Sequence, residues 1–408
     1  MGLSMKTKTK LNLNYGSIQA AYWMICSIVI SFASAFLLDR GYSSTVIGFV
    51  FAVGNILAII IQPLAAEITD KSKKICASDV IIFLASISVA SMAVIIAVPK
   101  SSILAAILFS VLIALFFSMQ SFISAVWFYL EETGYRINFG VCRAAGSLSY
   151  ALLCTVMGLV IKKYGSDTIL WGGIAASAVV IVTAAVSKVL HKKHLSKGDE
   201  RKVVFADNEK AVSARVFLKK YKLFTILMFG IACIFFAHNA LGNFYLQVIM
   251  PVGGDESDLG FLLGFTALLE LPAMIFYDKL SKKFGSGKLL IVSAVFFVVK
   301  TALIAVAQNM AFMYFAHVFQ LASFALYSPA IVKYVNETIP DEDAVKGQAF
   351  AAAMITVGSI FVSVTGGYII DTFGARTLMS ISTAVVAIGL FAIVIAVKKL
   401  KTADYKNK

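Results

Sequence analysis

Long apolar stretches separated by short polar breaks make up most of this chain. The runs at 79–98 and 376–397 are continuous rather than alternating, and a helix needs about 20 apolar residues to cross the hydrocarbon core of a bilayer. Strands of a membrane barrel are shorter and alternate in polarity. The pattern therefore predicts an all-α membrane protein with twelve spans, at 15–38, 45–67, 75–98, 102–129, 138–161, 168–190, 221–249, 258–278, 288–308, 310–335, 345–370 and 375–397.

The longest polar interruption divides the predicted spans into two sets of six. Residues 191–220 mix basic and acidic side chains without a sustained apolar run, which predicts a basic linker between six-helix bundles at 1–190 and 221–408. The halves also resemble each other, because 158–165 (GLVIKKYG) matches 367–374 (GYIIDTFG). Repeats of this kind are typical of transporters built from two related bundles, with the solute site expected at the midplane between them.

Composition and charge agree with lipid as the main solvent. The chain is 60% hydrophobic with a mean hydropathy of +0.87, against about 45–50% apolar residues in soluble domains. The net charge of +14 would suit a nucleic-acid partner, but 28 of the 36 Lys and Arg lie inside if both termini are cytoplasmic, with five outside and three in spans. This asymmetry predicts a multi-pass protein of the cytoplasmic (inner) membrane, with both termini and the linker in the cytoplasm and no nucleic-acid partner.

Several short motifs resemble those of the major facilitator superfamily. The stretches 47–52 (IGFVFA), 62–64 (QPL) and 70–74 (DKSKK) resemble the second helix and following loop of that family. The resemblance continues through 138–143 (NFGVCR) and 367–374, and it spans nearly the whole chain. More narrowly, the pattern looks like the lactose permease branch, the oligosaccharide:proton symporters. It implies the major facilitator fold of two six-helix bundles and transport by alternating access.

The resemblance also implies a gate at the end of the second span. In the family, an acidic residue at the position of Asp70 and the basic residues after it help to hold the two halves together in one access state. Gating is therefore the role implied for Asp70 and Lys71. The alternative is a solvated turn.

Charged side chains inside the predicted spans are candidates for function. A charge at the bilayer centre costs roughly 2.5–3.5 kcal/mol on insertion scales, so it usually faces a cavity or a partner. Glu270 lies near the middle of the eighth span, and Lys300 at the middle of the ninth is its expected partner. A structural ion pair is one interpretation. We assign proton coupling to Glu270 with Lys300, because a change in their separation between access states would alter protonation of the carboxylate.

Arg143 and Tyr150 are spaced to share one face of the fifth helix. The resemblance to lactose permease implies that Arg143 and Glu270 bind sugar hydroxyls and that Tyr150 stacks on the ring. The paired N–H donors of a guanidinium and the oxygens of a carboxylate can hydrogen-bond to vicinal hydroxyls, and a flat ring can stack on the apolar face of a sugar. The alternative for Arg143 is snorkelling to the cytoplasmic interface.

The tenth span presents His317 and Gln320 on one face, followed by Ser323. These positions fall where lactose permease has Lys, His and Glu residues used in binding and proton coupling, and all three differ here. We expect His317 and Gln320 to contact solute. The permease's proton relay and its preference for lactose do not carry over.

Motifs for other chemistry are missing from the sequence. It has no phosphate-binding loop, serine-hydrolase elbow, zinc-protease or dinucleotide pattern, so we expect neither an enzyme nor a cofactor. The five Cys are scattered without zinc spacing. His191 and His194 are spaced for a metal but lie among lysines, which favours a basic juxtamembrane face and no metal site.

The leading prediction is proton-coupled uptake of a sugar-like or other small polar solute. The expected partners are the solute, protons and the lipid bilayer, and the expected state is a monomer. One alternative is a proton-coupled exporter, although drug antiporters of this superfamily commonly carry a Gly-x-x-x-Gly-Pro pattern in the fifth helix, and 138–161 contains no Pro. A non-transporting sensor is the other alternative, which charges inside the spans disfavour.

Overall fold

The protein is helical throughout the part of the chain that the structure describes. The computed structural model describes residues 2–72, 75–194 and 214–400, and these contain helices and no strand. Within them, eleven helical segments are long and apolar enough to cross a membrane. The bent helix α11 makes twelve when its two halves are counted as one span. The predicted all-α membrane fold is confirmed.

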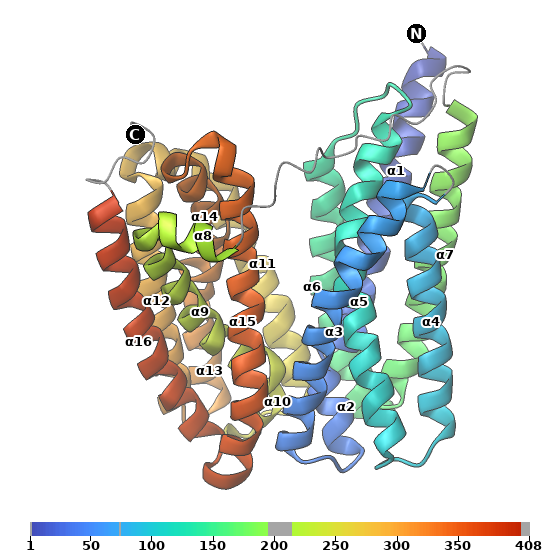
Figure 1. Ribbon diagram of the computed structural model, residues 1–408. Coiled ribbons are helices and arrows are strands. Elements are labelled where there is room, and N and C mark those ends of the chain that lie inside the picture. The colour runs from blue at the N-terminus through green and yellow to red at the C-terminus, as the bar shows by residue number, and fades with distance from the viewer. Residues whose placement is uncertain (1, 73–74, 195–213, 401–408) are drawn as a thin grey trace. The chain divides into compact units, whose positions relative to one another are not determined.

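The chain divides into two compact units (Figure 1). Unit 1 comprises Met1–Tyr42 and Val53–Glu209, and unit 2 comprises Ser43–Ala52 and Lys210–Lys408. The first turns of one helix, α3, thus pack as part of unit 2, whereas the rest of that helix packs in unit 1. The predicted linker at 191–220 lies largely outside the described residues.

Unit 1 is built around two long helices, α1 and α4. Helix α1 packs against α6 and α7, and α4 packs against α5 and α7. The elements are α1 (Gly2–Ile25), the π-helical η1 (Cys26–Ile30), α2 (Ala33–Asp39), α3 (Ser44–Lys71), α4 (Ala77–Ala97), α5 (Ile103–Glu131), α6 (Phe139–Tyr164) and α7 (Thr168–His194).

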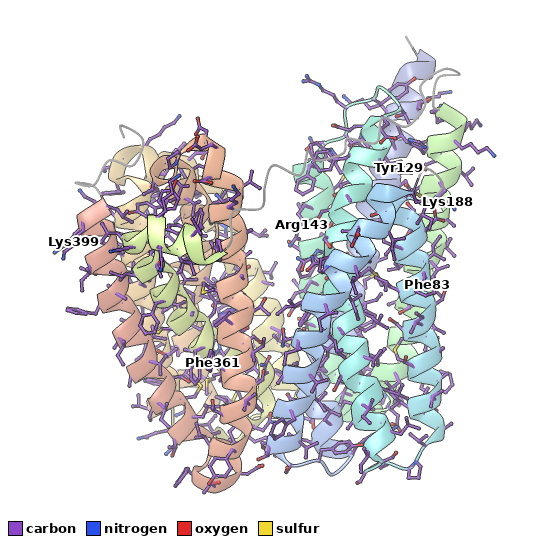
Figure 2. All side chains as sticks on the ribbon, viewed as in Figure 1. Phe83, Tyr129, Arg143, Lys188, Phe361 and Lys399 are labelled. Carbon is purple, nitrogen blue, oxygen red and sulfur yellow. The ribbon has the colours of Figure 1, made fainter. Side chains whose placement is uncertain are left out.

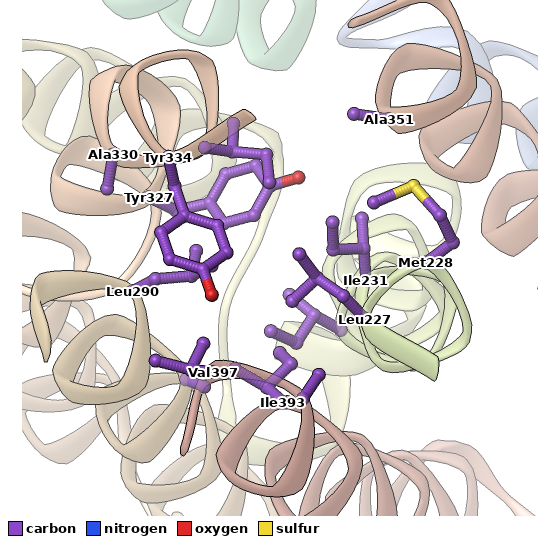
Figure 3. Close-up of a cluster of buried hydrophobic side chains, with 14 of the residues drawn as sticks. Leu227, Met228, Ile231, Leu290, Tyr327, Ala330, Tyr334, Ala351, Ile393 and Val397 are labelled. Carbon is purple, nitrogen blue, oxygen red and sulfur yellow. The ribbon is translucent and has the colours of Figure 1, made fainter. Parts of the chain in front are cut away.

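In unit 2, helix α9 packs against α15 and α16, and α12 packs against α14 and α16. Their buried side chains form one apolar cluster, in which Leu227 and Ile231 of α9 lie near Ile393 of α16 (Figure 3). The elements are α8 (Ala214–Lys220), α9 (Lys222–Asn243), α10 (Tyr245–Ile249), η2 (Met250–Val252), α11 (Glu256–Phe284), α12 (Ser286–Val306), α13 (Met310–Val318), η3 (Phe319–Leu321), α14 (Phe324–Thr338), α15 (Asp341–Phe373) and α16 (Ala375–Leu400).

Many large apolar side chains point outward from both units. Phe83 on α4 is 64% exposed and Phe361 on α15 is 63% exposed (Figure 2). Soluble monomers rarely expose contiguous apolar surface on this scale. These outer faces therefore suit contact with lipid.

Besides the predicted span at 15–38, which is α1, η1 and α2, two predicted spans are interrupted in the structure. The predicted helix at 221–249 is α9 followed by α10, with a break at Phe244. The predicted helix at 310–335 is α13, a 3-10 turn η3 and then α14. Residues 319–323 contain neither Gly nor Pro, so the sequence offered no local signal for this second break.

Candidate functional site

Two buried polar side chains of unit 2 and a partly buried carboxylate form a hydrogen-bonded chain, which we call the charge chain. The Lys300 ammonium on α12 donates to Oε1 of Gln320 at 2.5 Å, and Nε2 of Gln320 donates to Oε1 of Glu270 on α11 at 2.8 Å. Lys300 is 3% exposed and Gln320 is 4% exposed. The two predicted partners, Lys300 and Glu270, are thus linked through the predicted solute ligand Gln320.

The chemistry of Lys300 and Glu270 fixes the orientation of the Gln320 amide between them. An ammonium only donates, so the amide oxygen of Gln320 must face Lys300. The amide nitrogen then faces Glu270. An ionised carboxylate accepts a hydrogen bond from this N–H more strongly than a neutral carboxyl group does. A proton on the oxygen that accepts this bond would make that oxygen a weaker acceptor for the Gln320 N–H.

The break in the tenth span supplies Gln320. It lies in η3, between the end of α13 and the start of α14. Irregular backbone inside a membrane is tolerated where it is buried in protein or lines a cavity, and broken helices are common at transporter binding sites. The break therefore agrees with a functional role for this segment.

His317 lies one turn before Gln320 and is completely buried. Its Nδ1 is 2.7 Å from the carbonyl oxygen of Met313, which can only accept, so Nδ1 carries a proton. In the neutral imidazole, Nε2 then accepts from the Tyr245 hydroxyl at 2.6 Å. Because both ring nitrogens are occupied, direct contact of His317 with a solute would require one of these bonds to break.

Arg143, Trp23 and Tyr150 form a second polar group, in unit 1, which we call the aromatic cluster. The Arg143 guanidinium carbon lies 4.2 Å from the Trp23 ring centroid, and Nη1 donates to the Ser147 hydroxyl at 3.0 Å. Ser147 lies one turn deeper into α6 than Arg143, whose side chain therefore points away from the N-terminal end of the helix. Snorkelling to the interface at the N-terminal end of α6 would require the Arg143 side chain to point the opposite way.

Trp23 completes the aromatic cluster, although no motif in the sequence identified it as a site residue. Its ring meets Tyr150 edge-on at 5.9 Å. The close approach depends on Gly146, because a Cβ there would lie 2.5 Å from Trp23 Cδ1. The spacing of Arg143, Gly146 and Tyr150 on one helical face was visible in the sequence, but the partner helix was not.

A π-helical turn precedes the contact between Tyr150 and α1. The Ser31 hydroxyl follows η1 and donates to the Cys26 carbonyl at 3.2 Å. It lies 2.8 Å from the Tyr150 hydroxyl, which is then the donor of that bond. Short π segments inside helices are frequent at functional sites, and the Tyr150 ring is held here from both its edge and its hydroxyl.

Unit 2 also holds the first turn of α3 through a carboxylate on α15. Asp371 accepts from the backbone N–H of Ser44 at 3.0 Å, from the N–H of Thr45 at 2.7 Å and from the Thr45 hydroxyl at 2.6 Å. These N–H groups open a helix and have no partner within it. Gly367 permits the approach, since a Cβ there would lie 2.0 Å from the Ser44 carbonyl oxygen.

The other predicted positions have different outcomes. Asp70 and Lys71 close α3, but their side chains lie outside what the structure describes, and their gating role stays a prediction.

His191 is buried, stacks on Tyr129 and has Nε2 2.9 Å from Glu132. Glu132, the residue that caps the end of α5, covers His191, and the juxtamembrane basic face expected around His191 and His194 stays a prediction. Among the described residues, no three His, Cys, Asp or Glu side chains are grouped to hold a metal.

Comparison with known proteins gives matches over most of the chain. A model of the MFS_1 like family matches residues 18–381. The maltose permease of Geobacillus stearothermophilus is 24% identical over 367 residues, covering 88% of each chain. The uncharacterised transporter YwbF of Bacillus subtilis (strain 168) is 26% identical and covers 82% of this chain and 80% of its own length.

Solved structures agree on the fold. A crystal structure of a variant of the nucleoside transporter NupG superposes with a TM-score of 0.78, covering 95% of this chain and 99% of that one at 14% identity. At this identity the likeness concerns the fold alone.

Proposed function

The chain belongs to the MFS_1 like family of the major facilitator superfamily, and from this premise we propose that it takes up a neutral, sugar-like solute together with protons. Its family and its relatives are transporters, so the chain is a membrane transporter and not an enzyme. The proposal concerns the solute class, the coupling ion and the direction of transport. It also places the protein in the cytoplasmic membrane with both termini inside, on the asymmetry of its basic residues.

The observation that carries the proton-coupling proposal is the charge chain. Glu270, when ionised, accepts the Gln320 N–H, and Lys300 holds the other end of the same amide. A solute hydroxyl that binds the Gln320 amide and draws it away from Glu270 would remove a charge-assisted hydrogen bond from the carboxylate. Protonation of Glu270 then becomes easier, which makes proton uptake follow solute binding.

A sugar-like solute is supported by the chemistry of both polar groups. A guanidinium offers paired N–H donors to vicinal hydroxyls, and the faces of Trp23 and Tyr150 suit the apolar side of a sugar ring. Carboxylate and amide groups such as Glu270 and Gln320 complement hydroxyls in the same way. The full-length similarity to a maltose permease points to the same solute class.

The hydrogen bonds of Asp371 support an access gate in this proposal. They attach the first turn of α3, most of which packs in unit 1, to α15 of unit 2. Release of these bonds would free the first turn of α3 from α15 when the access state changes. In this scheme, Asp70 and Lys71 have the same task at the other end of α3.

Uptake into proteoliposomes tests the proposal. Purified protein is reconstituted and given radiolabelled maltose or uridine, with or without a pH gradient of about one unit, alkaline inside. One proton per solute predicts about tenfold accumulation of maltose, since one pH unit corresponds to about 1.4 kcal/mol. Accumulation of uridine alone would overturn the solute class. Equal maltose uptake with and without the gradient would overturn proton coupling.

A further inference from the structure

Unit 2 contains a pocket apart from the charge chain, with polar groups set in a mostly apolar lining. It has a volume of about 720 Å³ and lies between the C-terminal part of α11 and α14. Its polar lining residues are Tyr277, Asp278, Ser328, Lys333, Asn336 and Glu337. This volume falls within the range of small-molecule sites, roughly 300–1,000 Å³.

The pocket is separated from the charge chain along α11. Tyr277 follows Glu270 by seven residues, which is about 10 Å along a helix. Pro272 lies between them, and the helix bends by 51° between Ala273 and Ile275. A proline cannot donate the backbone hydrogen bond of its turn, so the pocket and the charge chain lie on differently directed halves of one helix.

Part of the pocket wall is fixed by internal bonds. The Lys333 ammonium donates to the Ser281 hydroxyl at 2.8 Å and lies 4.0 Å from Glu337. Glu337 also accepts from the Ser286 hydroxyl. These contacts order the charged groups before any ligand arrives, which lowers the entropy cost of binding.

Another part of the wall has hydrogen-bonding capacity unused by the described residues. The Tyr277 hydroxyl is buried and has no hydrogen-bond partner among them. An unmade hydrogen bond at a buried hydroxyl is costly, and a ligand that shifts the pocket wall enough to reach this oxygen would remove that cost. The Asn336 Oδ1 already accepts from Gln348, so its amide N–H groups are the donors it can offer.

The lining groups define the ligand chemistry. Two carboxylates, one amide and two hydroxyls can exchange hydrogen bonds with a molecule that carries several hydroxyls. Lys333 lies close to Glu337, so the pocket does not present an unbalanced positive charge to an anion. The ring of Tyr277 and the ring of Pro329 add apolar surface. These features fit a neutral polyhydroxylated molecule.

We propose that this pocket is a second binding site for neutral polyhydroxylated solutes, at the end of unit 2 that we expect in the cytoplasm. The structure supports the location of the site, whereas the choice of a sugar as its ligand rests on the proposed function.

Protection of an introduced cysteine tests the site. The five native cysteines are all buried, so Ser328→Cys provides a single reactive thiol in the pocket wall. Purified Ser328→Cys protein is labelled with N-ethylmaleimide while maltose is titrated. We expect maltose to slow labelling, and we expect the same protection in an Arg143→Ala background, where the proposed transport site is disabled.

Two matched tyrosine variants identify the contact. Tyr277→Phe removes only a hydroxyl that has no partner in the described protein, and we expect it to weaken protection roughly 2- to 10-fold. Tyr334→Phe removes another buried, unpartnered hydroxyl of unit 2 that does not line the pocket, and it should leave protection unchanged.

The outcomes separate this inference from the proposed function. Loss of protection in the Arg143→Ala background, or equal effects of the two tyrosine variants, would refute the second site. Maltose that is transported without protecting Ser328→Cys would also refute it, with the transport proposal intact. Maltose that protects without being transported would support the pocket and overturn the proposed cargo.

Discussion

Replacing Glu270 by Gln tests the charge chain at its proton-binding end. The new side chain keeps an oxygen that can accept the 2.8 Å bond from Gln320, so the fold should survive. A hydrogen bond to a charged group contributes about 1.5–3 kcal/mol and one between neutral groups about 0.5–1.5 kcal/mol. The expected loss of stability is therefore about 1–1.5 kcal/mol, which should leave membrane abundance near normal.

The loss of coupling should be much larger than the loss of stability. A glutamine does not titrate, so the variant cannot exchange a proton between access states. With a pH gradient of one unit, accumulation of maltose should fall from about tenfold to equilibration. Exchange of labelled for unlabelled maltose should continue, because neither direction of exchange requires net proton movement.

The assay compares accumulation, exchange and binding in the same proteoliposomes. Glu342→Gln is the matched control, because it makes the same chemical change at a carboxylate whose side chain is 75% exposed. His317→Gln should weaken accumulation only partly, since the amide can keep one of the two bonds that the imidazole makes. Retention of gradient-driven accumulation by Glu270→Gln would refute the assignment, as would its complete loss in His317→Gln with binding intact.

Three further predictions address other parts of the molecule. Arg143→Ala and Arg143→Lys should both lower maltose affinity at least tenfold in a binding assay at normal abundance, because an ammonium lacks the guanidinium fork; full transport by the Lys variant would leave Arg143 with an anchoring role only. Gly367→Ala should lower the transport rate at least tenfold, because its Cβ would lie 2.0 Å from the Ser44 carbonyl oxygen and force α3 away from Asp371, whereas Gly242→Ala, with no atom within 4 Å of the new Cβ, should transport normally. A cysteine placed at Lys192 on a cysteine-free background should react with an impermeant maleimide in inverted vesicles and not in intact cells, and labelling in intact cells would reverse the predicted topology.

The sequence by itself determined the fold class, because the length of an apolar run is a local property. A helix satisfies its own backbone hydrogen bonds, so about 20 apolar residues predict a span without knowledge of its neighbours. Glu270, Lys300 and Arg143 were identified in the same way, since a charge within such a run is costly wherever its partner lies. The spacing of His317 and Gln320 on one helical turn also followed from the sequence alone.

Only the tertiary structure decided which side chains meet. Each residue turns a helix by about 100°, so small differences in the rotation of neighbouring helices choose between several facing residues. That rotation places Trp23 against Arg143 and Glu132 against His191, and neither pair is close in sequence. It also places Gln320 between Lys300 and Glu270, through a helix break whose own residues, 319–323, include neither Gly nor Pro. The contact of Gly367 with the start of α3 depends on packing in the same way, because a glycine permits a close approach but does not select which helix will make it.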